Sequence, residues 1–126
     1  MSARGSPDMR LINSTRGAVL AEHVERAGTI RDRLRGLLGR SVLPEGRALA
    51  IAPCNAVHTF FMKFPIDAVF LDRRGRVVRA VPELPPWRAT RFHFRAVEVV
   101  ELPAGTLART GTRVGDELVF RESGAV

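Results

Sequence analysis

Turn residues divide this sequence into apolar runs that are short for helices and of the right length for β-strands. The runs cover residues 9–14, 18–24, 48–52, 57–62, 66–71, 76–81, 96–101 and 117–120. Glycine-containing turns join several of them, as at Arg16-Gly17 and at Asp72-Arg73-Arg74-Gly75. Short strands at this spacing predict a mainly β fold, a jelly-roll-like sandwich or barrel.

Two segments refine this prediction. Residues 66–71 are apolar on both faces except for Asp67, which predicts a central strand that is covered on both sides. Residues 82–89 hold three prolines within five positions. Because proline cannot donate a hydrogen bond in a sheet interior, we expect a loop there.

One short α-helix is predicted near residues 30–38. Thr29 is a suitable N-cap and Gly39 a suitable stop. An apolar stripe at helical spacing lies between them, formed by Ile30, Leu34, Leu37 and Leu38. A second helical turn is predicted at 106–110, ended by Gly111.

The chain of 126 residues is expected to form a single domain over residues 9–122, preceded by a flexible polar segment over 1–8. No apolar run approaches the roughly 18 residues of a membrane span. Residues 1–10 lack the apolar core of a signal peptide. We therefore expect a cytoplasmic protein, or a periplasmic one if a leader has been removed. A single cysteine cannot form an internal disulfide.

The net charge of +7 raises the question of a nucleic-acid partner, because arginine and lysine attract phosphates. Nineteen arginines and one lysine carry the positive charge, and they are scattered along the chain. A near-complete replacement of lysine by arginine is more typical of a genome-wide composition bias than of a binding surface. We therefore expect solvated basic faces and no nucleic-acid partner.

Cys54 and His58 are four residues apart, a spacing that occurs in metal sites. Two ligands do not make a site, because structural zinc takes about four ligands and catalytic zinc about three protein ligands. The pair could also serve as a nucleophile and its base, with the imidazole lowering the pKa of the thiol. A free cysteine is commonly a small buried hydrophobe. Cofactor and metal therefore stay open, and a structural role is favoured.

Alternation along 57–62 places His58, Phe60 and Met62 on one face of a predicted strand. One polar group among apolar ones is the usual lining of a small-molecule site, although a buried histidine in the core is an equal alternative. Trp87, the only tryptophan, could close such a pocket or plug the end of the fold.

Asp67 and Glu101 are carboxylates in apolar strands, and each requires partners because a bare buried carboxylate costs several kcal/mol. Asp67 could accept backbone N–H bonds or face an arginine. Glu101 is in step with Val97 and Val99, and it could cap the turn at 104–106 or the helical turn that follows. The two could also form an acid–base pair.

Three blocks of the sequence resemble the DUF192 family, also called UPF0127. They are RDRLRGLLGR at 31–40, HTFFMKFPIDAVFLDRRGRVV at 58–78 and VVELPAGTLARTGTRVGDEL at 99–118. Their order and spacing place the resemblance over about residues 11–120. The resemblance implies a mainly β, jelly-roll-like fold and no known activity. Some members look exported, with an apolar N-terminal segment, and because residues 1–10 depart from that pattern we do not expect an exported protein.

The family's recurring positions fall on Met62, Asp67, Asp72, Glu101, Pro103, Gly105, Gly115 and Asp116. Several of these are expected to be turn residues, which leaves His58, Met62, Asp67 and Glu101 as site candidates, with Cys54 beside them. The favoured hypothesis is a monomeric module that binds a small molecule in a pocket formed by His58, Phe60, Met62, Asp67, Trp87 and Glu101. The alternatives are an enzyme that depends on a metal or on Cys54 and His58, and a basic protein that docks to an acidic partner or nucleic acid.

Overall fold

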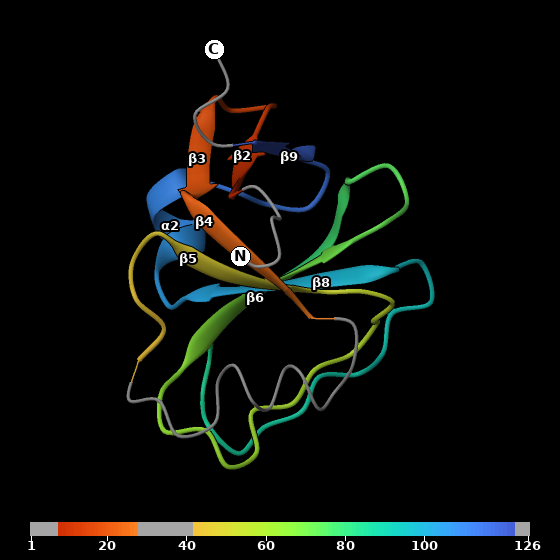
Figure 1. Ribbon diagram of the computed structural model, residues 1–126. Coiled ribbons are helices and arrows are strands. Elements are labelled where there is room, and N and C mark those ends of the chain that lie inside the picture. Colours follow the sequence, from red (N-terminus) through yellow and green to blue (C-terminus); the bar gives the residue numbers. More distant parts are fainter. Residues whose placement is uncertain (1–7, 28–41, 123–126) are drawn as a thin grey trace.

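The structure, a computed structural model, describes residues 8–27 and 42–122. These residues form two β-sheets and one short helix (Figure 1). The mainly β prediction is confirmed. In the described ranges the sheets are layered like a sandwich and do not close into a barrel. The helix predicted near 30–38 lies outside the described residues.

The larger sheet has five strands in the order β4-β5-β8-β6-β7. Their bounds are His23–Ala27 for β4, Arg47–Ile51 for β5, Glu98–Pro103 for β8, Ile66–Leu71 for β6 and Val77–Leu84 for β7. β4 and β5 are parallel, and the other neighbours are antiparallel. Every residue of β6 is buried, which confirms the prediction of a central, covered strand.

The smaller sheet has three strands in the order β3-β2-β9, with bounds Ala18–Ala21, Met9–Asn13 and Leu118–Glu122. The predicted hairpin of β2 and β3 is confirmed, with Gly17 at φ 69° in its turn. The prediction of one strand over 18–24 is wrong. The N–H groups of Glu22 and His23 both donate to the Gly46 carbonyl oxygen, at 2.8 and 3.0 Å. The chain leaves the smaller sheet there and enters the larger one as β4.

Side chains alternate along the central strands, so the larger sheet has an apolar core on each face. The core between the sheets includes Leu11, Leu20, Val69, Leu71, Val100, Leu102 and Leu107. The core on the other face includes Leu49, Phe70, Val99, Val57, Met62 and Phe64. We name the three-stranded sheet with the helix α2 (Thr106–Thr110) the sheet layer, and residues 53–65 and 85–97 the loop layer. Each layer covers one face of the larger sheet (Figure 1).

The loop layer contradicts the prediction of a strand over 57–62. Only His58 forms an isolated bridge, to Ala89, and the chain turns at Phe60 and Phe61. Phe61 has a φ of 69°, in the left-handed region that side chains other than glycine rarely adopt. The turn places Phe60 and Phe61 at the surface, and it ends the alternation on which the strand prediction depended.

Strand β7 continues through Pro82 to Leu84, so the loop that was predicted to begin at Pro82 begins at Pro85. Two features allow this. β7 is an edge strand, where proline is tolerated. A β-bulge also sets two residues of β7 against one of β6, because Ile66 pairs with Leu84 while Ala68 pairs with Val81.

The turn after β6 is as predicted, with Gly75 at φ 80°. A side chain at this position would place its Cβ 2.6 Å from the Leu118 carbonyl oxygen, which only glycine avoids. The predicted helical turn is also confirmed as α2, which Gly105 and Gly111 flank in left-handed conformations. No helix in the described part of the chain has the length and apolar character needed to cross a membrane.

Candidate functional site

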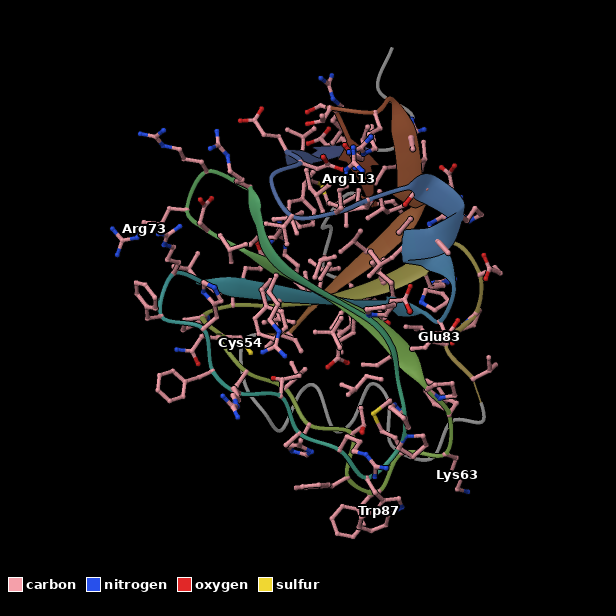
Figure 2. All side chains as sticks on the ribbon, turned by 180° about the vertical axis from the view of Figure 1, so that it is seen from behind. Cys54, Lys63, Arg73, Glu83, Trp87 and Arg113 are labelled. Carbon is pink, nitrogen blue, oxygen red and sulfur yellow. The ribbon has the colours of Figure 1, made fainter. Side chains whose placement is uncertain are left out.

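Backbone hydrogen bonds join the two segments of the loop layer along most of their length. They begin where Cys54 N–H donates to the Val97 carbonyl at 3.0 Å, and they end where Trp87 N–H donates to the Thr59 carbonyl at 2.9 Å. The segments are therefore a paired ribbon with irregular geometry. Cys54 and Trp87 mark its two ends in Figure 2.

Thr59 holds the Trp87 end of this ribbon together. Its side chain is fully buried, and its hydroxyl donates to the Pro85 carbonyl at 2.5 Å and accepts from Arg88 N–H at 2.9 Å. Its backbone N–H donates to the Arg88 carbonyl at 2.7 Å. Together with the hydrogen bond that the Thr59 carbonyl accepts from Trp87 N–H, these bonds fix the relative position of the turns at 60–61 and 86–87.

An aromatic cluster lies on these turns, formed by His58, Phe60, Phe61 and Trp87. His58 stacks on Phe60 with a centroid separation of 5.0 Å, and Trp87 lies 6.2 Å from Phe60 and 4.7 Å from Phe61. The rings stay accessible, with exposures of 38% for Phe60, 64% for Phe61 and 56% for Trp87. Trp87 has a φ of 63°, so two of the four residues have left-handed backbones.

Met62 does not belong to this surface. Its side chain is 3% exposed and packs in the core beneath the loop layer. The expectation that Met62 shares a face with His58 and Phe60 rested on a regular strand. The turn at Phe60 and Phe61 directs Phe60 outward and Met62 inward.

Asp67 is fully buried, and both carboxylate oxygens are engaged by backbone donors. Oδ1 accepts the N–H of Glu83, at the bulge of β7, at 2.8 Å. Oδ2 accepts the N–H of Leu107, in the first turn of α2, also at 2.8 Å. Of the two expected kinds of partner, backbone N–H groups and an arginine, the backbone N–H groups are present. Through these two hydrogen bonds Asp67 connects β6 to the edge strand β7 and to the first turn of α2.

Glu101 is also fully buried, but on the opposite face of the larger sheet. It pairs in register with Leu49 and Ala68, whose side chains belong to the core beneath the loop layer. Asp67 points toward α2 on the other side. The sheet therefore separates the two carboxylates, and they cannot form an acid–base pair. The Leu107 N–H in the first turn of α2, which Glu101 was expected to meet, donates to Asp67.

Cys54 is half-buried, and its thiol donates to the Ala56 carbonyl with Sγ 3.1 Å from the oxygen. Cys54 and His58 lie in the same segment of the loop layer. In the ranges that the structure describes, no group of three or more His, Cys, Asp or Glu side chains is arranged to hold a metal ion.

A polar cluster that the sequence analysis assigned only to turn chemistry lies in the sheet layer. Buried Asp116 accepts from the Arg16 guanidinium at 2.6 Å and from the Asn13 amide at 2.9 Å. Burial raises the pKa of Asp116, but these hydrogen bonds, the Arg113 N–H and the charge of Arg16 lower it by more, so the net pKa lies below its usual value. The cluster connects β2 to the turn before β9.

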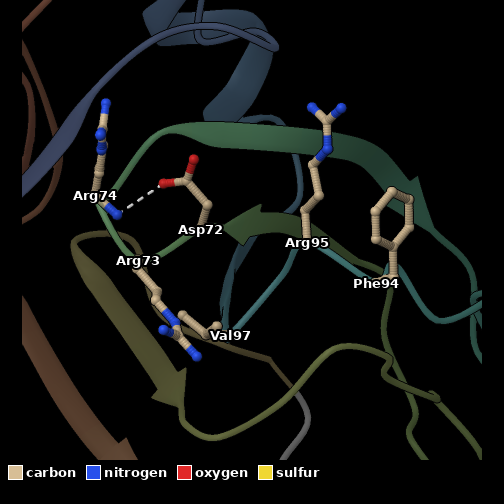
Figure 3. Close-up of a pocket in the computed structure, with 6 residues that line it drawn as sticks. All are labelled: Asp72, Arg73, Arg74, Phe94, Arg95 and Val97. Atoms are coloured by element: carbon tan, nitrogen blue, oxygen red, sulfur yellow. Dashed lines mark hydrogen bonds between the residues drawn. The ribbon is translucent and has the colours of Figure 1, made fainter.

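A second feature that the sequence analysis missed is a cleft beside the turn at 72–75. Arg73, Arg74, Arg95 and Phe94 line it, with Asp72 and Val97 (Figure 3). The pairs Arg73-Arg74 and Phe94-Arg95 were visible in the sequence, but their sequence separation concealed that they share a cleft.

The comparisons with known proteins agree with this fold. The model of the DUF192 family, described as "Uncharacterized ACR", matches residues 11–120. A UPF0127 protein of Thermococcus sibiricus is 32% identical over 116 residues, covering 86% of this chain and 72% of the relative. A UPF0127 protein of Thermococcus gammatolerans is 36% identical over 110 residues, covering 84% and 71%.

Among solved structures, a protein of unknown function from Novosphingobium aromaticivorans has a TM-score of 0.74 at 20% identity, covering 89% of this chain and 83% of that one. This likeness covers most of the chain and bears on the fold alone. The family match covers most of the chain, and it includes the aromatic turn, Asp67 and the Asp116 cluster. The chain belongs to the DUF192 family.

Proposed function

We propose that this protein is a binding module whose aromatic cluster of His58, Phe60, Phe61 and Trp87 contacts a small molecule. The observation that carries the proposal is that these rings contact one another and yet remain exposed by 38 to 64% for the three larger ones. Exposed aromatic side chains that gather at one place are typical of contact surfaces, because each buries a large area at low cost in side-chain entropy.

The backbone beneath the cluster supports a preorganised site. Left-handed conformations at Phe61 and Trp87 cost about 1–2 kcal/mol each. Such strain persists only where the surroundings impose it, and it gathers at functional sites. Here the hydrogen bonds of Thr59 impose it. A ligand that meets rings already held in place loses less affinity to ordering.

The chemistry of the cluster indicates the kind of ligand. Tilted ring faces suit a flat ring or the C–H face of a sugar. His58 Nδ1 accepts the N–H of Phe60 at 3.3 Å. We assign His58 as the polar member of the site, with Phe60, Phe61 and Trp87 as its ring surfaces.

Asp67, Glu101 and Met62 are not part of this proposal. Asp67 lies on the far side of the larger sheet with both oxygens engaged. Glu101 and Met62 lie in the core beneath the loop layer, on the side of the cluster that faces the sheet.

Trp87 is the only tryptophan, so its fluorescence reports on the cluster directly. The test is titration of the full chain with two uncharged probes, caffeine as a flat ring and maltose as a sugar. We expect saturable quenching or a spectral shift with one of them, and matching amide shifts by NMR near 58–61 and 86–88. Phe60→Ala should weaken the binding about tenfold, since a stacked aromatic contact contributes about 1–3 kcal/mol.

The matched control is Phe92→Ala, which removes an aromatic side chain that is 73% exposed and lies outside the cluster. It should leave the affinity unchanged. Equal losses from Phe60→Ala and Phe92→Ala, or no saturable signal with either probe, would contradict the proposal.

A further inference from the structure

The cleft between the turn at 72–75 and the loop at 94–97 has a composition that the aromatic cluster does not explain. Its volume is about 400 Å³, and three of its six lining residues are arginines (Figure 3). It lies at the Cys54 end of the loop layer, away from Trp87 (Figure 2). The inference drawn from it does not rest on the function proposed above.

The cleft is positively charged. Arg73, Arg74 and Arg95 contribute three charges, and Asp72 offsets one of them. Oδ1 of Asp72 is already engaged by the backbone N–H groups of Arg74 and Arg76, at 2.8 and 2.9 Å. In the part of the chain that the structure describes, no salt bridge involves the three arginines of the cleft. Their guanidinium groups are exposed and available to an anion.

An aromatic platform stands beside these charges. Phe94 is 81% exposed, the largest exposure among the large apolar side chains described. Its ring is parallel to that of His93 within 4°, with the centroids 5.6 Å apart. The Arg95 guanidinium carbon lies 5.7 Å from the Phe94 centroid, within reach of a cation–π contact. A planar ring could stack on the open face of Phe94 while its anionic group meets the arginines.

The charge extends beyond the cleft. Arg91 lies in the same loop as Arg95, and Arg79, on the neighbouring strand β7, donates to the Arg91 carbonyl at 3.4 Å. The two segments of the loop layer contain no aspartate or glutamate at all. An extended anion that leaves the cleft along this layer therefore meets added positive charge and no carboxylate.

We propose that this cleft binds single-stranded nucleic acid, with phosphates on Arg73, Arg74 and Arg95 and one base stacked on Phe94. Guanidinium groups beside exposed aromatic rings are how proteins hold single strands without reading their sequence. The continuation to Arg79 and Arg91 favours a polymer over a single nucleotide. The Phe94 ring, which is 81% exposed beside the arginines, favours an unpaired base over a lipid surface.

This proposal reverses the expectation drawn from composition. The scatter of arginine along the sequence argued against a nucleic-acid surface. Folding brings Arg73 and Arg74 next to Arg95, across about twenty positions of sequence, and no guanidinium group of the three forms a salt bridge among the described residues. The inference depends on where the arginines lie in space and on whether they form salt bridges, and the composition gives neither.

The test is fluorescence anisotropy of the full chain with a labelled oligothymidylate of about 12 nucleotides, from about 50 to 200 mM salt. Binding should weaken as salt rises, with a slope of about −0.7 for each phosphate contacted. Arg73→Ala/Arg74→Ala should reduce that slope by about 1.4. Phe94→Ala should weaken binding about tenfold and leave the slope unchanged, because stacking releases no counterions.

The matched control is Arg113→Ala/Arg121→Ala, which removes the same charge from exposed positions of the sheet layer. Figure 2 shows Arg113 apart from Arg73, the arginine of the cleft that the view labels. This variant should keep most of the wild-type affinity and its slope. Equal losses in the two double variants would show attraction to net charge alone, and they would overturn the site.

Two further outcomes would also overturn the proposal. One is thymidine monophosphate binding as tightly as the oligonucleotide, which would indicate a mononucleotide site. The other is vesicles of anionic phospholipid displacing the oligonucleotide at equal phosphate concentration, which would indicate a lipid surface. Circular dichroism of each variant establishes that the fold is intact, so that a loss of binding refers to the cleft.

Discussion

Arginine has two different roles on the two sides of the larger sheet. In the sheet layer, Arg16 donates to buried Asp116 at 2.6 Å, and Arg10 pairs with Glu22 at 3.1 Å. In the loop layer, Arg88, Arg91 and Arg95 are exposed, and none of the salt bridges among the described residues reaches this layer. One side chain type stabilises the fold on one side and is left to solvent on the other.

Polar and aromatic groups follow the same division. The sheet layer encloses a hydrogen-bonded polar cluster around Asp116, with Thr110 and Thr112 beside it. The loop layer exposes Phe60, Phe61, Trp87, Phe92 and Phe94. Rings that remain largely exposed and guanidinium groups without salt bridges contribute less to stability than buried, hydrogen-bonded groups do. From this comparison we expect polar substitutions in the sheet layer to cost more stability than substitutions on the exposed surface of the loop layer.

The largest loss of stability is expected at Asp67, whose carboxylate connects β6 to β7 and to α2. Asp67→Ala leaves the N–H groups of Glu83 and Leu107 buried without an acceptor. We expect a loss of about 3–5 kcal/mol in the free energy of unfolding, measured by urea denaturation. Asp67→Asn keeps one oxygen acceptor and should cost about 1–3 kcal/mol. A loss under about 1 kcal/mol in the alanine variant would mean that these bonds do not hold β7 and α2.

A matched pair of arginine variants tests the comparison itself. Arg16→Ala removes a charged donor from buried Asp116 and should cost about 1.5–3 kcal/mol. Arg73→Ala removes the same side chain from an exposed turn and should change stability by less than about 0.5 kcal/mol. Both values come from chemical denaturation under the same conditions. Equal losses of stability in the two variants would contradict the proposed difference between the two sets of arginines.

The smallest expected effect is a dependence of stability on acid. The folded-state pKa of Asp116 lies below its ordinary value of 3.8, so the unfolded chain takes up a proton first. Its contribution is therefore complete above about pH 4 and is lost as the pH falls through the folded-state pKa. Asp116→Asn should flatten this part of the curve when unfolding is followed from about pH 6 to about pH 2.5.

The contribution of Glu98 to stability should change with pH in the opposite direction to that of Asp116. Burial raises the pKa of Glu98 above 4.5 in the folded state, against the lowering effect of the Arg26 charge. Its contribution is present below about pH 4.5 and is lost as the pH rises through the folded-state pKa. Glu98→Gln should therefore remove a loss of stability on the alkaline side of this range. The same sign for both variants would contradict the assignment.

Much of the fold could be predicted because its signals are local. The covered character of β6 follows from six residues that are apolar on both faces except for Asp67, and the glycines at 17, 75 and 111 mark turns that only glycine accommodates easily. The predictions failed where a distant partner overruled local pattern. The N–H groups of Glu22 and His23 bond to the Gly46 carbonyl, so the chain leaves the smaller sheet at Glu22. Residues 57–62 pair with the segment 85–97 and form a loop where a strand was expected.

The candidate site was predicted in part for the same reason. His58, Phe60 and Trp87 were singled out as residue types suited to a pocket, and the structure brings them together. Phe61 was missed because strand alternation assigned it to the other face. Asp67 and Glu101 were considered together because both are carboxylates in apolar strands. The alternation within one strand shows which of its residues share a face, but not whether that face is shared with a residue of another strand. That depends on the register between β6 and β8.

The sequence by itself determined the mainly β class, the family, and the positions where the backbone must turn, since these depend on neighbouring residues and on side chains that only certain conformations accept. Only the tertiary structure decided which arginines have carboxylate partners, which aromatic rings remain exposed, and that Asp67 caps a helix forty residues away. The physical reason is that hydrogen bonding, burial and charge pairing depend on distance in space. Sequence separation does not set that distance until the strand register is fixed.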